Sequence, residues 1–163
     1  MYIEEKMEKA LNAQVNAEVA SAYLYVSMAA WLDANDLPGS AHWMKVQAEE
    51  ELEHAKKIYD YIDDRGGKTV FGAISAPKSE WKDVVELFEE VLAHEQTVTS
   101  LIYDLVDLAI GTKDHATVNM LNWFLSEQVE EEKSATDVLK KFKKMGTSPI
   151  ALNHIDKELG ARE

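Results

Sequence analysis

Apolar residues recur every three or four positions along four long segments of the chain. In the second segment, this apolar stripe consists of Met44, Ala48, Ala55, Ile58 and Ile62. Because an α-helix has ~3.6 residues per turn, this spacing puts the apolar side chains on one helix face. Each segment therefore predicts an amphipathic helix that buries one face against its neighbours.

Glycine and proline, the strongest helix breakers, are absent from these segments. The uninterrupted segments are residues 1–37, 40–65, 78–110 and 112–145. At ~1.5 Å per residue, each helix would be roughly 40–55 Å long, which is typical of a four-helix bundle. The sequence predicts an all-α fold in a single domain, residues 1–163, with the bundle in residues 1–145.

Capping residues support these boundaries. Serine is common at helix starts and glycine at helix ends, and such residues occur at Ser40, Ser79, Gly66 and Gly146. Ser148 followed by Pro149 is also typical of a helix start. It predicts a short fifth helix over about residues 149–159.

The connections between segments indicate the topology. Short connections join the first helix to the second and the third to the fourth, so each pair should form an antiparallel hairpin. The middle connection, residues 66–79, contains the β-like run Thr69-Val70-Phe71 and is long enough to follow the bundle from end to end. Helices two and three should therefore be parallel, with one long crossover between them.

Composition excludes several classes of function. The chain has no cysteine, so it cannot form disulfides, thiolate zinc sites or cysteine-ligated iron–sulfur clusters. Its formal net charge of −13 argues against non-specific binding to nucleic acid or to an anionic membrane. No signal-peptide pattern and no run of about 18 apolar residues occurs, so we expect a cytoplasmic, soluble protein with no nucleic-acid or membrane partner.

Polar residues interrupt the apolar stripe of every helix near its middle. Because these polar residues lie near the middle of their helices, their side chains should meet at one level of the bundle, whichever way the helices run. They are Glu18 in the first helix, Glu51 and His54 in the second, Glu95 in the third, and Gln128 and Glu131 in the fourth.

Converging carboxylates favour a multivalent cation. Buried carboxylates are costly and repel one another, and a bound cation removes both penalties. Glu51 and His54 are three residues apart and share one helix face. A ligand set of carboxylates and one imidazole, without sulfur, suits Fe²⁺ or Mn²⁺. Zn²⁺ could compete for the same site because it binds such ligands tightly.

Nearby aromatic and histidine residues have more than one interpretation. Tyr25 is either a core aromatic or a redox-active hydrogen-bond partner of the site. Trp123 is expected in the core. The remaining histidines, expected at the surface or in packing, are His42, His94, His115 and His154.

The chain resembles the prokaryotic non-haem ferritins over nearly its whole length. The segments that carry this resemblance are Asn16-Ala17-Glu18 with Ser21-Ala22-Tyr23-Leu24-Tyr25, then Ala48-Glu49-Glu50-Glu51-Leu52-Glu53-His54-Ala55, His94-Glu95 and residues 122–132. The resemblance implies a ferritin-like four-helix bundle.

The resemblance also implies a ferroxidase centre that oxidises Fe²⁺ with O₂. One iron would lie among Glu18, Glu51 and His54. The other would lie among Glu51, Glu95 and either Gln128 or Glu131, while Tyr25 could donate an electron. A third iron site is implied at Glu50, Glu127, Glu130 and Glu131. Ferric mineral would be stored in a homo-oligomeric cage of 24 subunits.

Departures from sister families refine this expectation. Bacterioferritins carry a second Glu-x-x-His motif in helix four and a haem-ligating methionine, whereas this chain has Glu130 three residues after Glu127 and Leu52 at the methionine position. We therefore expect no haem. Two alternatives stay open: a diiron oxidase or peroxidase that does not store iron, and a helical interaction module without a metal.

Overall fold

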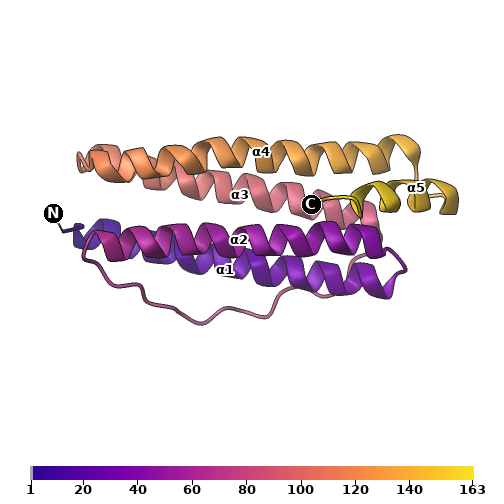
Figure 1. Ribbon diagram of the computed structural model, residues 1–163, viewed down its shortest axis with the longest axis horizontal. Coiled ribbons are helices and arrows are strands. Elements are labelled where there is room, and N and C mark those ends of the chain that lie inside the picture. Colours follow the sequence, from indigo (N-terminus) through magenta and orange to yellow (C-terminus); the bar gives the residue numbers. More distant parts are fainter. Residues whose placement is uncertain (1) are drawn as a thin grey trace.

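Five α-helices make up the regular structure of residues 2–163, the part of the chain described by the computed structural model (Figure 1). The all-α prediction is confirmed, and no strand occurs among the described residues. The predicted helix start at Met1 lies outside them. The helices are α1 (Glu5–Ala34), α2 (Pro38–Asp64), α3 (Val84–Gly111), α4 (His115–Met145) and α5 (Pro149–Leu159).

The four long helices form two antiparallel hairpins, α1 with α2 and α3 with α4 (Figure 1). The chain between α2 and α3 runs along the bundle, so these two helices are parallel, as the length of the connection predicted. The β-like run at residues 69–71 does not form a strand. Side-chain amides of α1 hold it instead: Asn12 bonds both Lys68 and Val70, and Asn16 also bonds Val70.

Two predicted helix caps are wrong, and two helix ends are confirmed. α2 begins at Pro38, before Ser40. α3 begins after Asp83, whose side chain accepts a hydrogen bond from the Glu86 backbone N–H, so Ser79 lies upstream of the helix. The helix ends at Gly66 and Gly146 are confirmed, since both have the positive φ that glycine tolerates best.

Ser40 fails as a cap because its side chain bonds another helix. Asp156 of α5 accepts hydrogen bonds from the Ser40 hydroxyl at 2.8 Å and from the backbone N–H groups of Gly39 and Ser40 at 2.9 and 2.7 Å. A Cβ at Gly39 would fall 1.8 Å from the Asp156 carbonyl oxygen. Glycine is therefore required for α5 to dock at the positive end of the α2 dipole.

The core consists of two separate apolar clusters. One includes Met28, Leu32 and Phe88, and the other includes Leu11 and Ile58. Between them, near the middle of the four long helices, lie buried polar side chains. None of the described helices has the length and apolar character needed to cross a membrane.

Candidate metal centre

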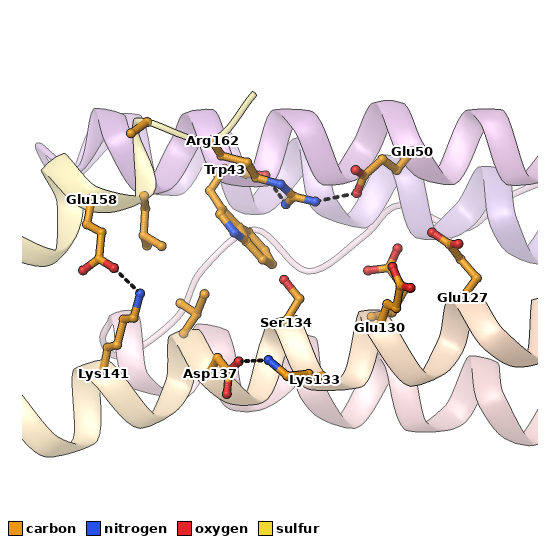
Figure 2. A pocket seen from close by; sticks show the side chains of 14 residues that line it. Trp43, Glu50, Glu127, Glu130, Lys133, Ser134, Asp137, Lys141, Glu158 and Arg162 are labelled. Carbon is orange, nitrogen blue, oxygen red and sulfur yellow. Dashed lines mark hydrogen bonds and ion pairs between the residues drawn. The ribbon is translucent and has the colours of Figure 1, made fainter.

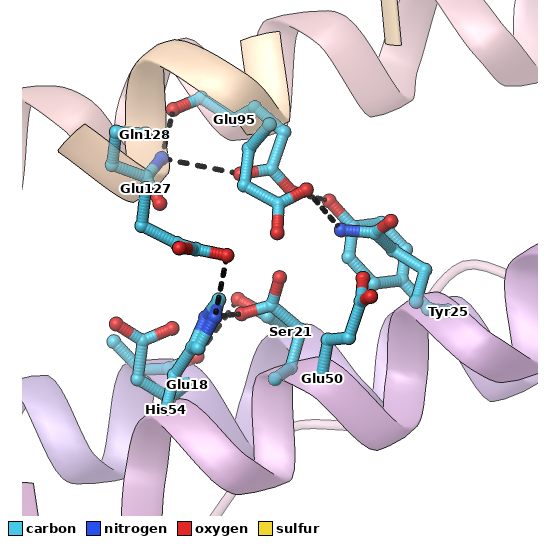
Figure 3. Close-up of polar contacts among 12 residues, drawn as sticks. Glu18, Ser21, Tyr25, Glu50, His54, Glu95, Glu127 and Gln128 are labelled. Atoms are coloured by element: carbon cyan, nitrogen blue, oxygen red, sulfur yellow. Dashed lines mark hydrogen bonds and ion pairs between the residues drawn. The ribbon is translucent and has the colours of Figure 1, made fainter. Parts of the chain in front are cut away.

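The buried polar side chains between the two apolar clusters form a polar layer. It contains all six polar residues that the sequence predicted to point inward, of which Figure 3 labels Glu18, His54, Glu95 and Gln128. Each comes from the inward face of a helix, because its spacing follows the apolar stripe on either side. Their exposed fractions are Glu18 1%, Glu51 1%, His54 3%, Glu95 1%, Gln128 3% and Glu131 5%.

On the side of α1 and α2, Glu18, Glu51 and His54 converge. Each offers a ligand atom, and these atoms lie within 4.8 Å of one another. His54 Nδ1 is 3.4 Å from Glu51 Oε2 without hydrogen-bond alignment. Glu18 Oε2, Glu51 Oε1 and His54 Nδ1 are fully buried and have no hydrogen-bond partner. Buried polar atoms are rarely left this way, so the arrangement fits a cation bound among oxygen and imidazole ligands.

On the side of α3 and α4, neutral donors hold the Glu95 carboxylate. The Tyr25 hydroxyl donates to Glu95 Oε1. The Gln128 side-chain amide donates to Glu95 Oε2 at 3.2 Å. Tyr25 is fully buried, and burial followed by the charge of Glu95 raises the pKa of its hydroxyl well above its usual value. Tyr25 is thus a core residue and also a hydrogen-bond partner of the site.

Burial raises the pKa of every carboxyl group in the layer. For Glu18 the next cause is the charge of Glu51, and for Glu51 it is the charge of Glu95. Burial and then the charge of Glu95 raise the pKa of Glu131 to about 7. The hydrogen bonds from Tyr25 and Gln128 partly offset burial at Glu95, whose pKa still stays above its usual value. A bound cation would favour the ionised form of these carboxyl groups, which burial disfavours.

Two buried glutamines belong to the layer and were missed by the sequence analysis. Gln14 donates from its side-chain amide to Glu18 Oε1 at 2.8 Å, and Gln47 donates to Glu131 Oε2 at 2.5 Å. Gln14 and Gln47 stand four residues before Glu18 and Glu51, so each lies on the same helix face as that inward glutamate. A glutamine one helical turn before an inward glutamate was the sequence signal that could have identified both residues.

The residues expected at a third iron site lie at the rim of the layer. Glu127 is partly buried, and its Oε1 is 3.7 Å from His54 Nε2. With Glu131, these two residues form a second group of ligand atoms within 4.8 Å of one another. Glu50 is partly buried and Glu130 exposed, and both line a cavity of about 770 Å³ beside the layer (Figure 2). The structure thus links Glu127 directly to His54, a contact that sequence spacing did not indicate.

The prediction that Trp123 lies in the core is wrong, since 40% of the side chain is exposed. Its ring forms a T-shaped pair with His54, and Lys57 Nζ lies 4.5 Å from the ring centroid. This position suits an amphipathic ring at the rim of a polar layer. His94 is a packing residue, as expected, with Nε2 2.7 Å from the Ser21 hydroxyl. The other three histidines, His42, His115 and His154, are exposed, as expected.

Comparison with known proteins explains this arrangement. The family model described as ferritin-like domain matches residues 8–145. The chain belongs to the ferritin family. It is 46% identical to the bacterial non-heme ferritin of Staphylococcus saprophyticus and 42% identical to that of Staphylococcus aureus, in each case over 98% of this chain and 96% of the relative.

Solved ferritins have the same architecture. The structure of an open pore ferritin from the archaeon Archaeoglobus fulgidus superimposes with a TM-score of 0.98 and 47% sequence identity, over the full length of both chains. The expected ferritin-like bundle with a short C-terminal helix is therefore confirmed. Membership of this family supports iron storage as the function of the chain.

Proposed function

We propose that this ferritin oxidises Fe²⁺ with O₂ at two adjacent iron sites inside the bundle and stores the ferric product. Glu18, Glu51 and His54 bind the first ion, and Glu51, Glu95 and Glu131 bind the second. We propose that both ions share Glu51, because it contributes to the first group and, in addition to burial, the charges of Glu95 and Glu131 raise its pKa. The observation that carries this proposal is the set of three buried, unpartnered ligand atoms on Glu18, Glu51 and His54.

The amide of Gln128 has a different role in this proposal. Its nitrogen donates to both the backbone oxygen and the carboxylate of Glu95. Gln128 therefore orients Glu95 toward the second ion, and Glu131 supplies the additional negative charge. The sequence left Gln128 and Glu131 as alternatives, and these hydrogen bonds favour Glu131.

Two adjacent ferrous ions can each give one electron to O₂ and so reduce it by two electrons together. A single Fe²⁺ ion can supply only one electron. The protein's part is to bind both ions within reach of one O₂ molecule. Because burial raises the pKa of Glu131 to about 7, this residue releases its proton when a cation binds near neutral pH. Tyr25 donates a hydrogen bond to Glu95, and we propose that it supplies a further electron.

The acidic cavity is the proposed route for iron. Glu50, Glu127 and Glu130 line it, and Glu127 lies between the cavity and His54. Negative charge in a concave site concentrates cations. We therefore propose that a third, transient iron site forms here with Glu131, and that iron passes through it between the inner pair and the mineral.

Storage requires an enclosed assembly, which we propose is a cage of 24 subunits in the cytoplasm. Size-exclusion chromatography with light scattering measures the oligomer directly. A stable monomer would contradict the storage role and leave a diiron oxidase or peroxidase.

Anaerobic titration of the apo protein with Fe²⁺, followed by O₂, tests the proposed reaction. We expect two or three rapidly oxidised ions per subunit and retention of many more. Glu51→Ala and His54→Ala should each abolish the rapid phase, whereas Glu53→Ala, an exposed glutamate on the same helix, should not. Unchanged kinetics in the first two variants would refute the site. Saturation at two ions without retention would favour the non-storing oxidase.

A further inference from the structure

The C-terminal tail beyond α5 returns to α2 and places Arg162 against the acidic cavity (Figure 2). The Arg162 guanidinium donates hydrogen bonds to Glu50 Oε2 at 2.5 Å, Gln47 Oε1 at 3.0 Å and the Trp43 carbonyl oxygen at 3.2 Å. Its Cζ lies 4.5 Å from the centroid of the Trp43 ring. The side chain is 19% exposed, so these contacts fix it in one place.

Arg162 forms an ion pair with Glu50, a carboxylate that a cation in the cavity would also bind. Glu50 and Glu130, with Glu127 near His54, form the outer acidic group. A guanidinium stays charged at any ordinary pH, so it both satisfies Glu50 and repels a cation approaching that carboxylate. A cation that binds Glu50 through Oε2 must displace Arg162, and a cation that approaches the other oxygen meets the charge of the guanidinium.

Arg162 also acts on the inner layer through Gln47. Because the guanidinium can only donate, the Gln47 amide must turn its oxygen toward Arg162. The Gln47 nitrogen then faces Glu131 and donates to Oε2. One residue of the tail thereby orients a carboxylate in the outer group and a carboxylate in the inner layer.

We propose that Arg162 is a positioning residue that weakens cation binding at the outer acidic group, so that iron there is passed on and not retained. This inference rests on the proposed role of the cavity as the iron route. Removal of the Arg162 charge should strengthen the outer site. It should leave the inner site at Glu18, Glu51 and His54 unchanged, because Arg162 contacts none of these three residues.

Calorimetric titration with Zn²⁺, which undergoes no redox reaction, measures this effect without iron oxidation. We expect Arg162→Gln to bind the outer Zn²⁺ about two- to fivefold more tightly than the unaltered protein, the scale of a partly exposed ion pair. Arg162→Lys should restore weak binding, because it restores the charge. Lys141→Gln is the matched control, since Lys141 lines the same cavity but bonds Glu158.

A second pair of variants tests whether Arg162 acts through its ion pair with Glu50. In a Glu50→Gln background, adding Arg162→Gln should not change Zn²⁺ affinity, because the carboxylate for which the two cations compete is gone. Tryptophan emission gives an independent measure: Zn²⁺ binding at the outer group should alter it in the unaltered protein, and this component should be lost in Trp43→Phe.

The inference is overturned if Arg162→Gln leaves the outer affinity unchanged, or if Lys141→Gln shifts it equally. Absence of a pair of tight inner sites in the unaltered protein would instead refute the proposed diiron function. The two failures are distinguishable because the outer and inner sites are titrated separately.

Discussion

The Tyr25 hydroxyl donates a hydrogen bond to Glu95 across 70 positions of sequence, joining α1 to α3 at the level of the candidate metal centre. Gln128 donates to the other oxygen of the same carboxylate. Both donors are neutral, so Glu95 is oriented without losing its negative charge to a lysine or arginine. A carboxylate held in this way keeps its charge for a metal ion.

Tyr25→Phe should weaken the proposed second metal site. Without the hydroxyl, Glu95 loses an interaction that lowers its pKa, and its orientation is less restricted. We expect iron oxidation to slow by about tenfold, the effect of losing one hydrogen bond to a charged group. Stopped-flow absorbance measures the rate, and Tyr23→Phe, an exposed tyrosine of the same helix, is the control. Equal rates in the two variants would show that Tyr25 serves packing alone.

Glu18→Gln should stabilise the metal-free protein. The carboxyl group is buried beside Glu51, and an amide removes the burden of a buried charge while still accepting the hydrogen bond from Gln14. We expect a gain of about 1 kcal/mol in the free energy of unfolding with a chelator present. Zn²⁺ should then stabilise the variant less than the unaltered protein. A variant less stable than the unaltered protein in chelator would contradict the electrostatic account, and Glu53→Gln is the exposed control.

Metal-free stability should increase as the pH falls from 8 toward 5. Glu131 has a pKa of about 7 in the folded protein, whereas an unfolded glutamate has a pKa of about 4.3. Between those values the folded state binds more protons than the unfolded state, so raising the pH through this range lowers stability.

Urea unfolding at several pH values, with a chelator present, measures this slope. Glu131→Gln should make it shallower. Saturating Zn²⁺ should reverse it, because protons then compete with the bound cation. If stability depends on pH equally in Glu131→Gln and in the unaltered protein, groups other than Glu131 cause the pH dependence.

Asp156→Ala should release α5 from the bundle. The change removes the acceptor of three hydrogen bonds and leaves the N–H groups of Gly39 and Ser40 unsatisfied. We expect a loss of about 3 kcal/mol in stability and faster amide exchange in α5. The inner metal sites should bind Zn²⁺ as before, because they lie at mid-bundle. Lys157→Ala, an exposed neighbour, is the control, and slow exchange in Asp156→Ala would show that α5 docks through its apolar face.

The parts of the fold that depend on local sequence were predictable. Apolar spacing and the positions of Gly66 and Gly146 located the helices, because helix geometry relates each residue to those three and four positions away. The same periodicity identified Glu18 and Glu95 as inward residues. Ser40 misled the prediction of a helix start because its hydroxyl bonds Asp156, far away in sequence.

Periodicity specifies which face of a helix is buried, but not which atoms of two helices meet. The folded bundle therefore decided that Tyr25 bonds Glu95, that Glu127 approaches His54, and that the tail brings Arg162 to Glu50 across 112 positions. Each contact depends on the rotation and register of packed helices and on the path of the chain between them. Those are set by side-chain packing over the whole core, and no local pattern encodes them.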